Sequence, residues 1–356
     1  MRARRVIEVA PKLFRTVVGD IGGGTWRAGI GSIGPKGVEV NGYEKETLKF
    51  GSTKELLDFA LARLKHFDLT GISTVVISNA GPVDKQKGTI IKITNQGGVE
   101  ERNIPLVKEM SDALTKFAKR PIKVYLINDA EAGAWAEFGP GGGLNHLKPG
   151  QLGMVLIVGN GVGGYLMELA EDGSLIPVPG ADEPGHRPVP ASLVTKLKLW
   201  YLGSYCGCLL RGDMAEQRDP CLEVLTRGPA LEKAFQMELN DPSVTNQQVV
   251  KMLYDNDQLT QGKILGVLMN EALLLARSLD QVQRGLELTK GKMHITPIGG
   301  VGCGFGNWLV PLLNAVSRQN ANIARPAWGI SPEYYVAGFD PDFTNLVGNT
   351  VLAARK

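Results

Sequence analysis

The sequence predicts an α/β protein that is divided into two lobes. The chain has 356 residues, which exceeds one typical core and makes two domains the default. Each half opens alike, with an apolar strand, a glycine loop and a second apolar strand, at residues 15–33 and 152–169. Segments with the helical spacing of apolar residues follow in both halves. We place the boundary in the glycine- and proline-rich connection 139–151, so that the lobes comprise residues 1–140 and 141–356.

The first lobe reads as a meander of strands followed by alternating helices and strands. Glycine turns separate its first three strands, which is typical of antiparallel pairing. Ser52 and Glu55 are expected to form a capping box at the start of the first helix. The segment 81–88 is expected to be a loop. The expected strands are 15–21, 27–33, 37–47, 73–81 and 122–130, and the expected helices are 52–67, 103–120 and 130–138.

The second lobe continues from its strand–loop–strand unit into long helical patterns. Its "EDGS" segment, residues 171–174, reads as a hairpin turn between two strands. A further strand, at 293–298, enters a third glycine loop at 299–302. The expected helices are 260–288, 307–319 and 342–356, and the last of them is expected to pack back on the first lobe.

Composition and charge exclude several classes of protein. The formal net charge is +3, and the one basic cluster, "MRARR" at the start, is too short for a DNA-reading domain. That segment also lacks the apolar core of a signal peptide, and no apolar run could span a bilayer. Four cysteines in a chain of this size indicate a reducing compartment. We therefore expect a cytoplasmic protein without nucleic-acid or membrane partners.

Two glycine loops each allow two interpretations. "GDIGGGTWRAGI", residues 19–30, suits a tight hairpin turn or a phosphate loop in which backbone N–H groups approach an anion and the acid holds a metal's water shell. "GNGVGG", residues 159–164, matches a dinucleotide motif, but a strand rather than a helix is expected after it. A phosphate clamp between two strands fits this second loop better.

Asp129 lies where a strand is expected to end and a helix to begin. An aspartate there is a favoured helix N-cap. A carboxylate at the carboxyl end of a strand also lies where α/β folds bind ligands, and could take a proton from an attacking hydroxyl. The residues alone leave both interpretations open.

A histidine and three cysteines form a partial metal signature. Cys206, Cys208 and Cys221 with His186 make the right kind and number of ligands for a closed structural zinc site. The alternative is that the cysteines are small buried residues. Glu183 and His186 lie in one glycine- and proline-rich loop, which faces either a polar ligand or solvent. Cys303 stands apart.

In order, these motifs resemble the ROK family of sugar kinases, within the actin-like, hexokinase-like ATPase superfamily. The matching segments are "DIGGGT", "SNAGPVD", "NDAEAGAWAE", "GNGVGG", "EPGH", "CGC…CLE" and "PIGGVG". The resemblance runs from Gly19 to the last helix. It implies two ribonuclease-H-like lobes, as in actin-like ATPases, with mixed sheets flanked by helices and a cleft between them.

The resemblance also implies roles for individual residues. Asp129 would be the general base acting on a sugar hydroxyl, that of glucose or a close relative at carbon 6, with ATP as donor and Mg²⁺ near Asp20. His186 would bind both sugar and zinc. The other sugar-binding residues would be Gly81, Asn95, Asn128, Glu183 and Glu223. The nucleotide would be held by Asp20, Gly22, Gly23, Gly24, Thr25, Asn160, Gly161, Gly163, Gly299 and Gly300. A homodimer or homotetramer is implied as well.

The sequence departs from the family pattern at several points. The first loop has an additional glycine, Asn160 replaces a threonine, and Glu131 replaces an asparagine just after the proposed base. An insertion between Cys208 and Cys221 puts the zinc site in question, although long loops cost little entropy.

Two other functions are compatible with parts of this sequence. A sugar-sensing regulator would keep the fold, but only about a dozen residues precede the first strand, too few for a three-helix DNA-binding domain at ordinary helix lengths. An actin- or Hsp70-like ATPase would use "DIGGGT" but not the histidine and cysteines. Other hexoses, N-acetylated hexosamines, and ADP or polyphosphate as donors stay open.

Overall fold

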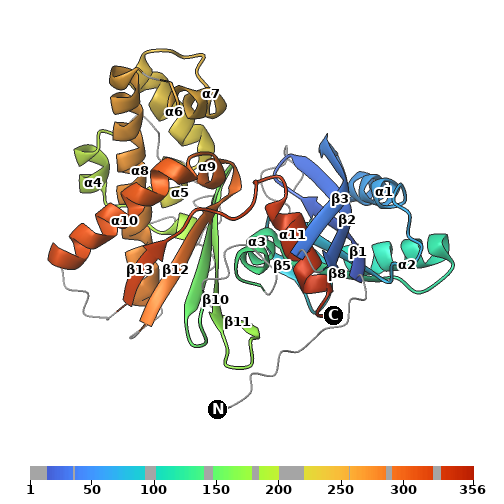
Figure 1. Cartoon of the computed structure of the whole chain (residues 1–356). Helices are drawn as coiled ribbons and strands as arrows, with labels where there is room; N and C mark the ends of the chain where they lie inside the picture. The colour runs from blue at the N-terminus through green and yellow to red at the C-terminus, as the bar shows by residue number, and fades with distance from the viewer. Residues whose placement is uncertain are drawn as a thin grey trace. The chain divides into compact units, whose positions relative to one another are not determined.

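The computed structural model describes residues 14–34, 37–92, 102–139, 147–178, 184–199, 220–255, 257–285, 291–323 and 330–356. Contacts between Cα atoms divide the chain into two units (Figure 1). The first comprises Met1–Gly142 together with Asn345–Lys356, and the second comprises Gly143–Thr344. The last residues of the chain therefore belong to the unit that begins it.

The first unit is built on a five-stranded mixed sheet of order β3-β2-β1-β4-β8. β1, β2 and β3 pair antiparallel, as the meander predicted, whereas β1, β4 and β8 pair parallel. The carboxyl ends of the parallel strands meet at one edge, where Asn79 is paired in register with both Ile21 and Asn128. The strands are β1 (Phe14–Ile21), β2 (Thr25–Gly34), β3 (Gly37–Thr47), β4 (Thr74–Asn79) and β8 (Lys123–Asn128).

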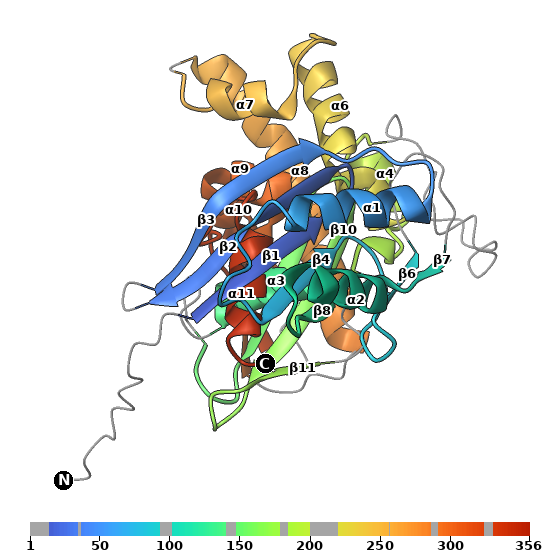
Figure 2. The same ribbon diagram turned by 90° about the vertical axis from the view of Figure 1, so that its right-hand side faces the viewer.

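Helices cover both faces of this sheet. α1 (Thr53–Leu64) and α2 (Leu106–Ala118) lie on one face, and α3 (Asp129–Phe138) and α11 (Thr344–Ala353) lie on the other (Figure 2). The core on the α1 and α2 side is made of apolar side chains at alternate strand positions, such as Val75 and Ile77 of β4.

The capping box at α1 forms only in part. The Ser52 side chain accepts a hydrogen bond from the Glu55 backbone N–H at 3.2 Å, as predicted. The Glu55 carboxylate, however, accepts from the N–H of Gly51 rather than from that of Ser52. The Glu55 N–H, one of the orphan donors in the first turn of α1, is therefore satisfied.

A small antiparallel sheet of β5 (Val83–Asp84), β6 (Thr89–Lys92) and β7 (Arg102–Ile104) lies between β4 and α2 in the chain. The expected loop at 81–88 thus contains the first strand of a hairpin. The helix expected from residue 103 starts only at Leu106, because Pro105 biases the residue before it towards the extended region.

The second unit repeats the plan of the first. Its five-stranded sheet has the order β11-β10-β9-β12-β13, with β9, β10 and β11 antiparallel and β9, β12 and β13 parallel. The predicted "EDGS" turn joins β10 to β11. The strands are β9 (Leu152–Val158), β10 (Val162–Leu169), β11 (Leu175–Pro177), β12 (Gly291–Ile298) and β13 (Ile330–Tyr334). The repeated sheet confirms the predicted two-lobed α/β fold.

The helices of the second unit build a separate apolar core around the long α8, which packs against α6 and α10. None of the described helices is both long enough and apolar enough to cross a bilayer. The described helices of the second unit are η1 (Pro184–His186), α4 (Ala191–Lys196), α5 (Leu222–Thr226), α6 (Gly228–Leu239), α7 (Asn246–Met252), α8 (Gln258–Gly285), α9 (Gly299–Gly304) and α10 (Gly306–Ile323).

The prediction of a third glycine loop at residues 299–302 is wrong, because these residues are helical. Gly299, with φ of +82°, turns the chain sharply after β12 and is the first residue of the short helix α9, which the glycine-rich residues up to Gly304 continue. Glycine has a low helix propensity, so the sequence favoured a loop, and packing in the folded unit overrides that preference. Val301, for example, is 4 % exposed in the core.

Candidate functional site

Asp129 is the first residue of α3, directly after β8. Asn128 provides the N-cap, because its Oδ1 accepts the backbone N–H of Ala130 at 2.9 Å. The Asp129 Oδ1 also accepts this N–H at 2.9 Å. The side chain of Asp129 is half-buried rather than sealed in the core. Asn128 rather than Asp129 is therefore the N-cap of α3, and Asp129 stays partly accessible at the sheet edge.

Gly81 lies beside this helix start. The Asn128 Nδ2 donates a hydrogen bond to the Gly81 carbonyl oxygen at 3.0 Å, which joins two of the predicted sugar-binding residues. Gly81 has φ of +142°, a conformation that a side chain would strain. Asn95, the third predicted sugar-binding residue of this lobe, lies outside the described residues.

Asn79 is a polar residue of the same edge that the sequence reasoning missed. It ends β4 and is 1 % exposed. Neither its amide nitrogen nor its amide oxygen has a hydrogen-bond partner among the residues that the structure describes. Leaving a buried amide unpaired costs free energy, so this position is suited to a ligand or a bound water molecule.

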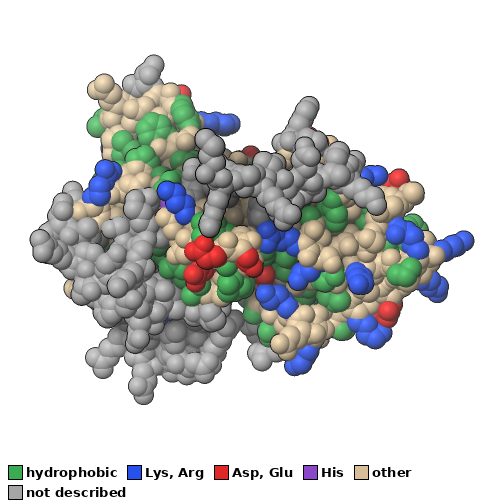
Figure 3. Space-filling model, turned by 60° about the horizontal axis from the view of Figure 1, so that its bottom comes forward, with side chains coloured by type: hydrophobic (Ala, Val, Ile, Leu, Met, Phe, Trp, Pro, Cys, Tyr) green, Lys and Arg blue, Asp and Glu red, His purple; other side chains and the backbone are tan. Residues whose placement is uncertain are grey.

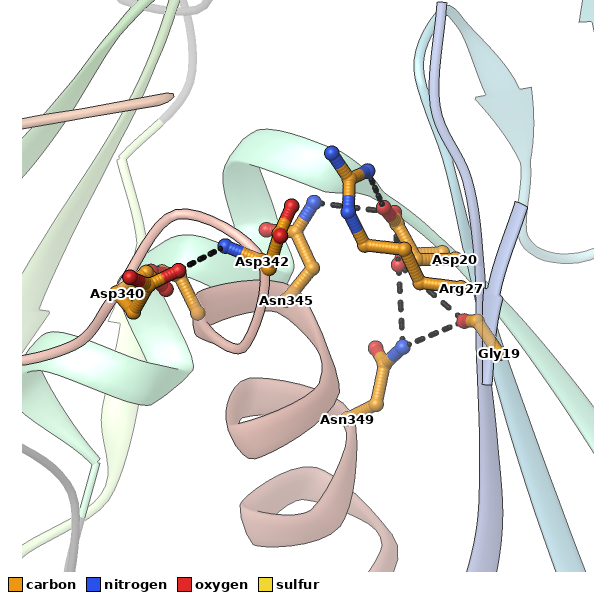
Figure 4. Close-up of polar contacts among 9 residues, drawn as sticks. Gly19, Asp20, Arg27, Asp340, Asp342, Asn345 and Asn349 are labelled. Carbon is orange, nitrogen blue, oxygen red and sulfur yellow. Dashed lines mark hydrogen bonds and ion pairs between the residues drawn. The ribbon is translucent and has the colours of Figure 1, made fainter. Parts of the chain in front are cut away.

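Asp20 lies at the carboxyl end of β1 and is almost fully buried (Figure 4). Its Oδ1 accepts hydrogen bonds from Ser78 at 2.8 Å and from Asn345 at 3.0 Å, and its Oδ2 accepts from Arg27 at 3.0 Å. Asn349, one turn after Asn345, donates to the Gly19 carbonyl. These partners come from three different elements, β2, β4 and α11, and no sequence pattern pairs them.

This arrangement does not fit direct coordination of Mg²⁺ by Asp20. Three donors already occupy its two oxygens, and the Arg27 guanidinium would repel a cation at the same carboxylate. We therefore assign no metal–carboxylate bond to this residue, and the expectation of Mg²⁺ near Asp20 stays a prediction.

The first glycine loop connects β1 to β2. The N–H of Gly22 donates to the Thr25 carbonyl at 2.8 Å, and the N–H of Gly24 donates to the Gly22 carbonyl at 2.8 Å. Gly24 has φ of +138°, which explains a glycine there. Gly23, Gly24 and Thr25 are partly exposed. The loop is thus a tight turn between antiparallel strands, the geometry that both the hairpin and the phosphate-loop interpretations require.

The second glycine loop connects β9 to β10, so no helix follows it and the dinucleotide motif is excluded. Asn160 at its tip is exposed, and a Cβ built at Gly163 meets no described atom within 4 Å. The Gly159 carbonyl accepts the N–H of Gly228, the first residue of α6, at 2.6 Å. The loop is therefore anchored on a helix start that the sequence reasoning missed.

The start of α9 lies against the same loop. A Cβ on Gly299 would be 2.9 Å from the carbonyl oxygen of Val158, the residue before Gly159, so only glycine fits there. Gly300 is exposed, and a Cβ built there would meet no described atom within 4 Å. The predicted nucleotide-binding residues of the second unit, Asn160, Gly161, Gly163, Gly299 and Gly300, thus belong to two adjoining turns.

Glu223 and His186 are brought close to the start of β10. The Glu223 Oε2 accepts the N–H of Val162 at 3.0 Å. Gly185, just before His186, packs so tightly on Val162 that a Cβ would lie 2.2 Å from the Val162 carbonyl oxygen. Both predicted sugar-binding side chains are half-buried. The folded chain therefore brings the segments Pro184–His186 and 221–223 close to the second glycine loop.

Two of the four predicted zinc ligands are also neighbours. A β-bridge pairs Pro188 with Cys221, which places the buried Cys221 across from a residue only two positions after His186. Cys206, Cys208 and Glu183 lie outside the described residues. Within the described ranges no group of three or more His, Cys, Asp or Glu side chains could hold a metal ion.

Among the described residues of the first unit drawn in Figure 3, Lys and Arg side chains form no continuous band. A stripe of merged positive charge is the footprint of a nucleic-acid-binding surface.

Comparisons with known proteins agree with the geometry. The family model described as "ROK family" matches residues 17–286. No curated protein sequence matches the chain.

Several solved structures share the fold. A glucokinase from Balamuthia mandrillaris, in complex with glucose, has a TM-score of 0.68 and 18 % identity, over 98 % of this chain and 95 % of that chain. A ROK family glucokinase from Streptomyces griseus, in complex with glucose and AMPPNP, has a TM-score of 0.66 and 19 % identity, over 96 % and 100 %. A ROK family transcriptional regulator, a homologue of the E. coli MLC protein, has a TM-score of 0.65 and 15 % identity, over 96 % and 80 %. With the family model covering most of its length, the chain belongs to the ROK family.

Proposed function

We propose that this protein transfers the γ-phosphoryl group of ATP to the 6-hydroxyl of a hexose, glucose or a close relative. The observation that carries the proposal is the position of Asp129. It follows a strand at the carboxyl edge of the sheet, its side chain is partly exposed, and Asn128 fills the capping role beside it. Membership of the ROK family and the sugar kinases among the structural neighbours support it.

In the proposed reaction Asp129 is the general base. Its carboxylate accepts the proton of the sugar hydroxyl while the hydroxyl oxygen bonds to the γ-phosphorus and the bond from that phosphorus to the β,γ-bridging oxygen of ATP breaks. ADP leaves with the bridging oxygen. Asn128, Gly81, Glu223 and His186 would hold the other hydroxyls and fix the direction of attack, which is the main contribution a protein makes to phosphoryl transfer.

The two glycine turns would hold the nucleotide. Each follows the first strand of its sheet, and neither has side chains beyond Asn160 and Thr25 to obstruct an approaching phosphate. Mg²⁺ bound with the nucleotide would neutralise charge on the phosphates, as in other phosphoryl transfers. The start of α9, at Gly299 and Gly300, would border the adenosine.

We propose further that zinc binds His186, Cys206, Cys208 and Cys221. A Cys₃His donor set suits tetrahedral zinc, and His186 could bind the metal through one ring nitrogen and a sugar hydroxyl through the other. A cytoplasmic homodimer or homotetramer remains part of the proposal, as do N-acetylated hexosamines as alternative substrates.

The proposal is tested by measuring ADP release over a panel of hexoses and N-acetylhexosamines, for the wild type and for Asp129→Asn. Asparagine has the same shape but cannot take the proton, so kcat should fall by about 10²–10⁴-fold. Asp112→Asn is the matched control, because Asp112 is an exposed residue of α2 whose carboxylate pairs with Lys108 of the same helix. It should leave kcat unchanged.

Sugar binding, measured by calorimetry, distinguishes the proposed kinase from its rival, a sugar-sensing regulator. A wild-type protein that binds a hexose yet forms no sugar phosphate with ATP, ADP or polyphosphate as donor would be a sugar-sensing regulator. Equal activity of the wild type and Asp129→Asn would refute Asp129 as the base.

A further inference from the structure

Glu131 departs from the family pattern, and the structure gives it a partner. It lies in the first turn of α3, two residues after Asp129, and is 6 % exposed. The Nζ of Lys85 lies 3.1 Å from its Oε1 and 3.0 Å from its Oε2. Lys85 follows β5 in the hairpin after Gly81, and its own side chain is 48 % exposed. The buried carboxylate of Glu131 is thus paired with the ammonium group of a partly exposed lysine from the hairpin.

A second bond links the same two segments. The Asn128 amide donates to the Gly81 carbonyl oxygen at 3.0 Å. In the chain, Asn128 and Glu131 flank Asp129, and Gly81 and Lys85 begin and end the segment that they contact. The hairpin is therefore fastened to the start of α3 on both sides of the proposed base.

The two bonds differ in what they would cost to break. An amide–carbonyl bond can be exchanged for water at little net cost. An ion pair with a nine-tenths buried carboxylate cannot, because loss of the cation leaves a charge with little solvation. The pair with Lys85 is therefore the stronger restraint on the position of the hairpin.

We propose that Lys85 and Glu131 are positioning residues of the sugar site. Their ion pair holds the segment from Gly81 to Lys85 against α3, which fixes the Gly81 carbonyl and the Asp129 carboxylate at the spacing that one hexose requires. The inference rests on the proposed function of Asp129. Glu131, which replaces the asparagine of the family pattern, thereby has a structural role specific to this chain.

The test compares Lys85→Met and Glu131→Gln with the wild type in steady-state kinetics. Both variants should raise KM for the hexose by about tenfold or more, since small displacements of a positioned substrate are costly. KM for ATP should stay unchanged. Lys85→Arg keeps the charge and should restore the wild-type KM. In the double variant the two effects should not add, because both remove one interaction.

Lys87→Met is the matched control. Lys87 lies in the same hairpin, is 78 % exposed, and pairs with Asp84 within that hairpin rather than with α3. It should leave both KM values unchanged. An unchanged KM for the hexose in Lys85→Met would overturn the proposal, and so would a loss of thermal stability without a change in this KM.

Hydrogen exchange separates this inference from the proposed function. If the pair is the restraint, exchange in residues 81–88 should be faster in Lys85→Met than in Lys87→Met, with or without turnover. A wild type that phosphorylates no sugar would refute the kinase assignment. Unaltered exchange in Lys85→Met would refute the restraint whatever the activity.

Discussion

At the scale of single residues, Glu271 is the clearest case of a polar group placed against its chemical preference. It lies in α8, is 3 % exposed, and its Oε1 has no hydrogen-bond partner among the described residues. Burial raises its pKa well above the usual value of 4.5. The residue borders a cavity of about 490 Å³ that Gly262, Gly266 and Lys263 also line. Nothing in the local sequence of α8 indicates this burial.

Glu271 should therefore make stability fall as pH rises. The folded state binds the proton of the Glu271 carboxyl group more tightly than the unfolded state does. The resulting contribution to the free energy of unfolding is therefore fully present below pH 4.5 and is lost as pH rises towards the raised pKa. Glu271→Gln should unfold at higher urea concentration than the wild type at neutral pH, and the difference should shrink towards pH 4.5. Glu238→Gln, an exposed residue lining the same cavity, is the control. Equal pH dependence of the wild type and Glu271→Gln would contradict the expectation.

At the scale of elements, α11 links the end of the chain to the start of the first unit. Asn345 and Asn349 on one side of α11 donate to Asp20 and Gly19 of β1. Gly348 packs directly on α3, where a Cβ would lie 1.7 Å from the Ala132 carbonyl oxygen. The helix therefore contacts both the strand that leads to the first glycine loop and the helix that begins with Asp129.

Gly348→Ala should separate α11 from α3 and lower the free energy of unfolding by about 1–3 kcal/mol or more, the usual cost of overpacking. Gly262→Ala is the matched control, because a Cβ at this exposed position of α8 meets no described atom within 4 Å. It should raise stability by about 0.5–1 kcal/mol through helix propensity. Urea denaturation of both variants measures the contrast, and a neutral Gly348→Ala would show that α11 does not pack as described.

At the scale of the whole molecule, two sheets of the same strand topology each belong to a unit that brings together residues distant in the chain. The first unit receives α11 from the C-terminus, and in the second unit a β-bridge pairs Pro188, two residues after η1, with Cys221. Such long-range closure is also what the proposed zinc site requires, since its ligands span residues 186–221.

Elemental analysis of the purified full chain should therefore find zinc in stoichiometric amount. Cys221→Ser and Cys206→Ser should lose it, because a closed site needs all of its thiolates. Cys303→Ser should retain the metal, since Cys303 lies in α9, apart from the proposed ligand set. A wild type free of zinc after metal-replete expression would refute the site and leave the cysteines as buried apolar residues.

The sequence by itself determined the five strands of the first sheet, the two glycine turns and the position of Asp129 at a strand end. These features depend on local preferences, such as the period of apolar residues and the backbone freedom of glycine, which a linear pattern contains. Even at this level it failed at residues 299–304, where packing made a helix of glycines.

Only the tertiary structure decided which side chains meet. Ser78, Arg27 and Asn345 surround Asp20, Lys85 neutralises Glu131, and Gly228 anchors the second glycine loop. Asn345 is 325 positions from Asp20, and no local rule relates residues so far apart. The physical reason is that a buried polar group must find its partner in space, and the fold alone sets which groups arrive there.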